Sequence, residues 1–171
     1  MNVIRHVNIV FTGGTIEKVY DEVQGEIGNI AEQIDEFFAR LRLPYVQLHP
    51  SRLMNIDSLN MTEEHRAKIC EKVEFLQGKG YPIVIIHGTD TMVETGRYLQ
   101  RHMSEIRLPV ILTGAMRPLI VENSDGYQNL AESIFATQFL AGGIYIVFHN
   151  QVYDIDNVRK NREKKTFERI T

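Results

Sequence analysis

The sequence predicts an α/β protein, with a flavodoxin-like doubly wound parallel sheet in a three-layer α/β/α arrangement. Short apolar runs, of which residues 83–86 are the clearest, are rich in β-branched residues, as buried parallel strands are. Segments with helical periodicity alternate with these runs along the chain, which predicts right-handed βαβ units. A length of 171 residues with 43% hydrophobic residues suits one compact domain.

Taken in order, the apolar runs predict the strands and the periodic segments predict the helices. The expected strands are residues 7–11, 45–48, 83–86, 109–112 and 144–148. The expected helices lie between them: one after Asn29 through Leu41, one capped by Thr62 and ended by Gly78, one from Met92, and one capped by Asp125 and ended by Gly142. The last of these is expected to include Phe135, Phe139 and Ala141. Residues 20–29 are polar and predict a loop.

The end of the chain has a different composition. Residues 156–171 hold six lysines and arginines against three acidic residues, with few apolar side chains. We expect residues 1–150 to form the core of a single domain (residues 1–171). Residues 151–171 are expected to be a charged tail, which is either a solvated end or a segment that only a partner subunit or a ligand orders.

Composition excludes several classes of function. The net charge of -3 gives no electrostatic reason to expect nucleic acid or an acidic membrane as a partner. No stretch approaches 18 apolar residues, and the run after Met1 is too short for a signal peptide, so a cytoplasmic protein without membrane contact is expected. Cys70 is the only cysteine, which excludes an internal disulfide and favours a half-buried structural thiol.

Four unusual loops each follow a predicted strand. They contain residues 12–15, 57–58, 89–90 and 113–117, and the carboxyl ends of parallel strands meet at one rim, where ligands bind. Two of the loops place a glycine directly before a threonine, so backbone N–H groups can approach a ligand closely. Threonines, an aspartate and backbone donors suit attack on a carbonyl, with a hydroxyl nucleophile, an oxyanion hole and a carboxylate for a substrate amine.

A threonine nucleophile needs a base, and other chemistries fit less well. Tyr20 and Lys160 are the residues near these loops that could act as the base. Thr89 or Asp90 could instead only cap the helix that follows. Residues 12–15 lack the lysine and spacing of a P-loop, and the six histidines show no metal-ligand spacing, so neither a metal nor a cofactor is expected.

Four motifs together resemble one family. TGGTIE (12–17), HGTDTM (87–92), TGAMRP (113–118) and SDGYQNL (124–130) are similar to the signatures of the bacterial-type L-asparaginase/glutaminase family, which has a threonine nucleophile. The resemblance covers essentially the whole chain but only the family's N-terminal domain. It implies that Thr15 is the nucleophile, that Thr89, Asp90 and Lys160 form a catalytic group, and that Ser58 holds the substrate carboxylate. The substrate-binding residues expected on this basis are Gly14, Asp57, Ser58, Gly88 and Ala115, and Thr12 is expected to be a turn former.

The sequence also departs from the family pattern. Leu59 and Asn60 stand where the family usually has a polar residue and then an aspartate, which removes a hydrogen-bonding group near the expected α-amino position. The family has a tyrosine in the loop after the nucleophile, and Tyr20 is the candidate for it here. The loop from Thr15 to Tyr20 is shorter than in the longer members of the family. The family's larger members have a second domain that completes the site of a neighbouring subunit, and this domain is not expected here. A homo-oligomer is expected.

The resulting expectation is an amidohydrolase that converts L-asparagine to L-aspartate and ammonia through an acyl-threonine intermediate. Three alternatives stay open. One is an L-glutaminase of the same mechanism, and another is a non-catalytic module that binds a small amino acid. The third, a phosphate- or nucleotide-binding module, rests on fold analogy alone.

Overall fold

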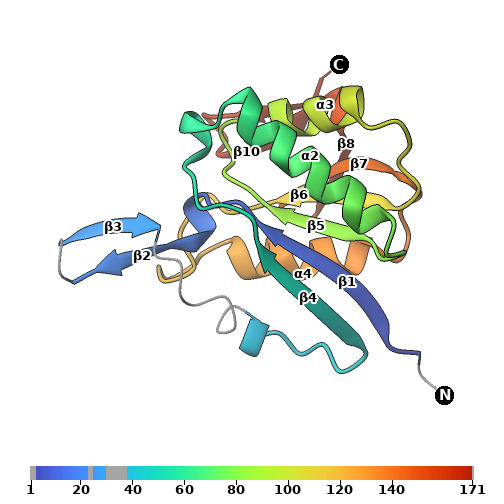
Figure 1. Ribbon diagram of the computed structural model, residues 1–171. Helices are drawn as coiled ribbons and strands as arrows, with labels where there is room; N and C mark the ends of the chain where they lie inside the picture. The colour runs from blue at the N-terminus through green and yellow to red at the C-terminus, as the bar shows by residue number, and fades with distance from the viewer. Residues whose placement is uncertain (1–2, 23–24, 30–37, 171) are drawn as a thin grey trace.

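A mostly parallel six-stranded sheet forms the centre of the computed structural model, which describes residues 3–22, 25–29 and 38–170. The strand order is β4-β1-β5-β6-β7-β8 (Figure 1). Its first five members follow the 2-1-3-4-5 order of flavodoxin-like sheets, which confirms the predicted fold class. After β1 the chain adds β4 on one side of this strand and then β5 to β7 on the other side, so the strand order reverses at β1. Ligands bind at such a reversal, beyond the carboxyl ends of the strands, and the expected site therefore lies at the ends of β1 and its neighbours.

The five predicted strands are present, with longer bounds in four cases. They are β1 (Arg5–Phe11), β4 (Val46–Arg52), β5 (Ile83–Ile86), β6 (Pro109–Thr113) and β7 (Gly143–Phe148). Every residue of β5 and β6 is buried, as the apolar run 83–86 predicted for an interior strand. A sixth strand, β8 (Gln151–Asp154), pairs antiparallel with β7 and was not predicted.

Helices cover both faces of the sheet. Helices α2 (Glu63–Gln77) and α3 (Met92–His102) lie on one face and α4 (Gly126–Ala136) on the other (Figure 1). Thr62 caps α2 as predicted, in a capping box with His65. The helix predicted after Asn29 falls mostly on residues 30–37, outside the described residues.

Helix α4 ends earlier than predicted. Its C-cap is Thr137, so the chain leaves the helix before Phe139. The apolar pattern therefore extended the predicted helix too far, and Phe135 and Phe139 are exposed on the surface.

Two antiparallel hairpins replace segments that were predicted to be irregular. Strands β2 (Lys18–Asp21) and β3 (Glu26–Asn29) follow a 3₁₀ turn, η1 (Thr15–Glu17), and project from the body of the domain (Figure 1). Strands β9 (Val158–Asn161) and β10 (Thr166–Arg169) form the second hairpin, after the 3₁₀ turn η3 (Ile155–Asn157).

The second hairpin packs on the core of the domain. Val158 and Phe167 are buried in the core, and the Phe167 ring meets Phe148 edge-on at 5.1 Å between centroids. The Tyr153 hydroxyl donates to the Phe167 carbonyl at 2.7 Å. The two buried side chains and the Tyr153 hydrogen bond attach the hairpin to the core, although most of its other residues are charged or polar.

Among the residues that the structure describes, no helix is long and apolar enough to cross a membrane, and no three potential metal ligands cluster. Cys70 is buried, and burial raises the pKa of its thiol, in keeping with a structural role.

Phe167 should anchor the tail. Phe167→Ala is expected to lower the free energy of unfolding by about 3–5 kcal/mol, because it leaves a cavity in the core. Phe139→Ala is the matched control: this ring is 71% exposed, and its loss should change stability little. Denaturant unfolding of both variants measures the difference, and equal effects would contradict the anchoring role.

Candidate active site

Glycines allow the loops after β1, β4 and β5 to meet backbone to backbone. A Cβ built on Gly14 would lie 2.5 Å from the backbone nitrogen of Gly88, and one on Gly88 would lie 2.5 Å from the Ser58 hydroxyl oxygen. Gly14 also has a φ of 100°, which L side chains rarely adopt. Any larger residue at these positions would force the loops apart.

Two further glycines extend the same packing. A Cβ on Gly13 would collide with the backbone of Ile56, whose N–H donates to the Thr12 carbonyl at 3.0 Å. A Cβ on Gly114 would collide with the carbonyl of His87. All four predicted loops therefore gather at one rim of the sheet.

Thr15 and Thr12 have different environments within the first loop. Thr15 begins η1 directly after Gly14 and is partly exposed. Thr12 is fully buried, and its hydroxyl donates to the Ile86 carbonyl at 2.8 Å. Thr15 is thus the threonine of this loop that a ligand can reach, and Thr12 ties β1 to β5.

A buried ion pair holds the first loop from behind. Glu17 is 2% exposed, accepts from the Gly13 N–H at 3.0 Å and pairs with Arg52 at 2.6 Å. Burial raises the pKa of Glu17, and Arg52 opposes that rise.

The structure brings Thr89, Asp90 and Lys160 into one hydrogen-bonded group. The Lys160 ammonium donates to the Thr89 hydroxyl at 2.7 Å and to Asp90 Oδ1 at 3.0 Å. The Lys160 side chain is 15% exposed, so it is not a solvated tail lysine. Arg162 reaches the same Asp90 oxygen at 2.9 Å, a contact that was not predicted.

Asp90 does not cap the helix that follows it. The N-cap position of α3 is Thr91, and no side chain caps the first turn of the helix. The Thr91 hydroxyl donates instead to the Ser58 carbonyl at 2.8 Å, across the rim. The capping alternative for Asp90 is therefore wrong, and its carboxylate faces the cationic side chains.

The loop after β4 positions three residues differently. Ser58 is 2% exposed and lies beneath Gly88. Asp57 accepts from the Leu59 N–H at 3.1 Å and pairs with Lys18 at 3.2 Å. Both contacts lower the pKa of Asp57, and the hydrogen bond from the Leu59 backbone contributes most. Leu59 is 66% exposed, so it does not pack beneath the loop.

Tyr20 stands apart from this group. It lies on β2 opposite Ile27 and is 56% exposed, and its side chain forms no hydrogen bond with any other described residue. Of the two candidate bases, the structure therefore places only Lys160 in contact with other predicted site residues.

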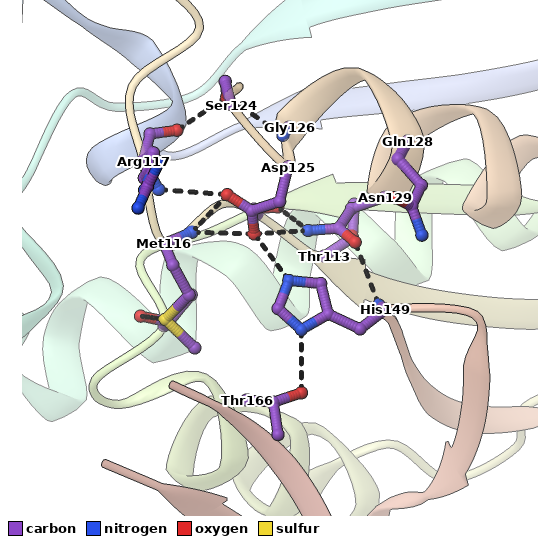
Figure 2. A network of polar contacts seen from close by, with 12 residues as sticks. Thr113, Met116, Arg117, Ser124, Asp125, Gly126, Gln128, Asn129, His149 and Thr166 are labelled. Carbon is purple, nitrogen blue, oxygen red and sulfur yellow. Dashed lines mark hydrogen bonds and ion pairs between the residues drawn. The ribbon is translucent and has the colours of Figure 1, made fainter. Parts of the chain in front are cut away.

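The loop after β6 is held by a network that the sequence did not predict (Figure 2). Asp125 occupies the N-cap position of α4, as predicted, but its carboxylate accepts from the backbone N–H groups of Met116 and Arg117 at 3.0 Å and not from the first turn of the helix. Asn129 and His149 contact the same carboxylate at 2.9 and 3.0 Å. This network fixes the loop that contains Ala115, which is itself buried.

His149 extends the network to the tail hairpin. Its Nδ1 lies 2.9 Å from the Thr166 hydroxyl on β10 (Figure 2). The motif SDGYQNL was a signal for Asp125 and Asn129, but no local pattern pointed to His149 or Thr166, which come from distant parts of the chain.

His87 supports the central loop as a neutral side chain. It is fully buried, and desolvation lowers its pKa to about 4. Its Nδ1 donates to the Gly88 carbonyl at 2.8 Å, and its Nε2 lies 2.8 Å from the Thr95 hydroxyl. The ring thus fixes the turn that presents Thr89 without adding charge.

Comparison with known proteins gives consistent matches. L-asparaginase 1 of Escherichia coli K12 is 30% identical over 94% of this chain and 47% of its own length. A polypeptide of the glutamyl-tRNA(Gln) amidotransferase of Pyrococcus abyssi is 30% identical over 86% of this chain and 34% of its own length. The thermostable L-asparaginase from Thermococcus kodakarensis superposes with a TM-score of 0.86 at 28% identity, over 96% of this chain and 51% of that one.

The chain thus spans about half or less of the length of these relatives. The family model for the N-terminal part of asparaginases matches residues 6–170, which is nearly the whole chain. This protein belongs to the asparaginase family.

Proposed function

We propose that this protein is an amidohydrolase that converts L-asparagine to L-aspartate and ammonia. The observation that supports this most is the Thr89–Lys160–Asp90 group, set beside the partly exposed Thr15 by the Gly14–Gly88 contact. Relatives named L-asparaginase support an amide as the substrate, and the amidotransferase relative supports an amidohydrolase of the family without choosing asparagine.

In the proposed reaction, the Thr15 hydroxyl oxygen adds to the side-chain amide carbon. Collapse of the adduct breaks the C–N bond and releases ammonia, which carries away the hydroxyl proton. Water then hydrolyses the acyl-threonine ester, with Thr89 and Lys160 orienting it. Lys160 is better placed than Tyr20 to move the protons, because it already bonds to the Thr89 hydroxyl.

Binding would use the remaining residues of the rim. Backbone N–H groups near Gly88 and Ala115 would hold the oxyanion, and the Asp125 network keeps the second of these loops rigid. Ser58 would hold the substrate carboxylate and Asp90 the ammonium, with Gly14 and Asp57 shaping the loops around them. A neighbouring protomer would cover the open side of the rim in a homo-oligomer.

Thr15→Ala should reduce ammonia release from asparagine at least about a thousandfold, because the nucleophile is lost. The fold should persist, since Thr15 is partly exposed. Thr15→Ser is the control, and it should keep much of the activity because it keeps a hydroxyl. A steady-state assay with asparagine and glutamine side by side measures both; turnover by the alanine variant within a few-fold of the parent removes Thr15 as nucleophile.

Asp90→Asn should lower kcat/KM for asparagine at least about tenfold, because the charge-assisted contacts of the carboxylate are lost. Stability should change little, because Asp90 is not the cap of α3. Glu94→Gln is the matched control in the helix that follows: it removes a carboxylate that pairs with Arg66 at 3.3 Å, away from the group. Equal kinetics for the two variants would argue against a role for Asp90.

Leu59→Gln should lower the KM for asparagine by roughly tenfold to a hundredfold with little change in kcat, since one hydrogen bond to a charged group is worth ~1.5–3 kcal/mol. The exposed position of Leu59 means that the substitution should not loosen the loop. Kinetics and a melting curve on the same variant check both statements, and an unchanged or raised KM refutes the first.

A further inference from the structure

Two cationic side chains contact the Asp90 carboxylate, which the proposed function assigns to the substrate ammonium. Its Oδ1 lies 3.0 Å from the Lys160 ammonium and 2.9 Å from the Arg162 guanidinium. Lys160 also bonds to Thr89 and belongs to the proposed reaction, whereas Arg162 bonds to nothing else among the described residues. Two cations thus share one carboxylate, and the group has a net positive charge.

Nearby acids do not relieve this excess. Asp57 is already paired with Lys18. Glu168, on the same hairpin as Arg162, accepts from Arg159, Asn161 and Lys164. Within the described part of the chain, Asp90 is therefore the carboxylate that Arg162 pairs with.

We propose that Arg162 is a specificity-determining residue: it competes with the α-ammonium of asparagine for Asp90, and so lowers the preference of the site for asparagine over ω-amides that lack this group. A substrate ammonium that approaches Asp90 meets a guanidinium already bound there, and like charges repel. A substrate with hydrogen at the α-carbon avoids that repulsion, and its carboxylate gains from the positive charge. Leu59, exposed beside Ser58, offers an ammonium no hydrogen-bond acceptor from its side chain.

This inference rests on the proposed function for the reaction itself. Hydrolysis of succinamate, the four-carbon ω-amide that lacks the amino group, makes and breaks the same bonds as hydrolysis of asparagine. The amide C–N bond breaks, ammonia leaves with the threonine proton, and water releases succinate. No oxidant or further reactant is needed.

The kinetic test compares kcat/KM for asparagine and for succinamate by ammonia release. Arg162→Ala should raise the ratio of asparagine to succinamate about fivefold, as expected for one partly exposed charge. Arg162→Lys keeps the charge and should leave the ratio near that of the parent. Arg159→Ala is the matched control, because Arg159 lies on the same hairpin, is similarly exposed and pairs with Glu168. An unchanged ratio in Arg162→Ala, or an equal change in Arg159→Ala, overturns the proposal.

A binding test separates this inference from the proposed reaction. Calorimetry with succinate and aspartate on the same proteins needs no turnover. If neither amide is hydrolysed, the proposed function fails, and a preference for succinate that Arg162→Ala weakens about fivefold still supports the role of Arg162. The same preference in the parent and in Arg162→Ala, or no binding of either acid, overturns it.

Discussion

The close approach of Gly14 to Gly88 is the contact on which the candidate site depends. A Cβ on either residue would collide with backbone or with Ser58, so the loops after β1, β4 and β5 can meet only where glycine stands. Thr15 and Thr89 each follow one of these glycines, and their relative position is therefore set by backbone packing. A nucleophile and a proton-transfer group need that kind of fixed geometry, because small displacements weaken catalysis strongly.

Apolar packing of the tail hairpin brings Lys160 into the same site, although Lys160 is far from Thr15 and Thr89 in the sequence. Val158 and Phe167 are buried on the two strands of the tail hairpin, and Lys160 lies directly opposite Phe167 in the ladder. A second connection comes from His149, which contacts Asp125 and Thr166 and so joins the loop after β6 to the hairpin. The hydrophobic core thus places the ammonium beside Thr89.

The sequence predicted the parallel sheet and the gathering of its loops because both follow from apolar runs and from what stands directly after them. It did not predict the hairpins, since Val158 and Phe167 are separated by charged residues and their burial depends on Phe148 and the rest of the core. Asp125 does occupy the N-cap position of α4 that the sequence predicted, yet its carboxylate accepts from the N–H groups of Met116 and Arg117, which the sequence did not predict. Contacts between distant segments decided the burial of the tail, and no local pattern contains them.

The two ion pairs Glu17–Arg52 and Asp90–Arg162 at the rim differ in their exposure to solvent. Glu17 is 2% exposed and pairs with Arg52, so losing Arg52 would leave a buried carboxylate with only the Gly13 N–H as a partner. Arg162 is 70% exposed, and its pair with Asp90 has water as an alternative partner. The groups of the proposed chemistry are less exposed than Arg162: the Lys160 side chain is 15% exposed and the Asp90 side chain 25%. Arg162, the charge proposed to select among substrates, stands on the solvent side, where a substitution should not disturb the core.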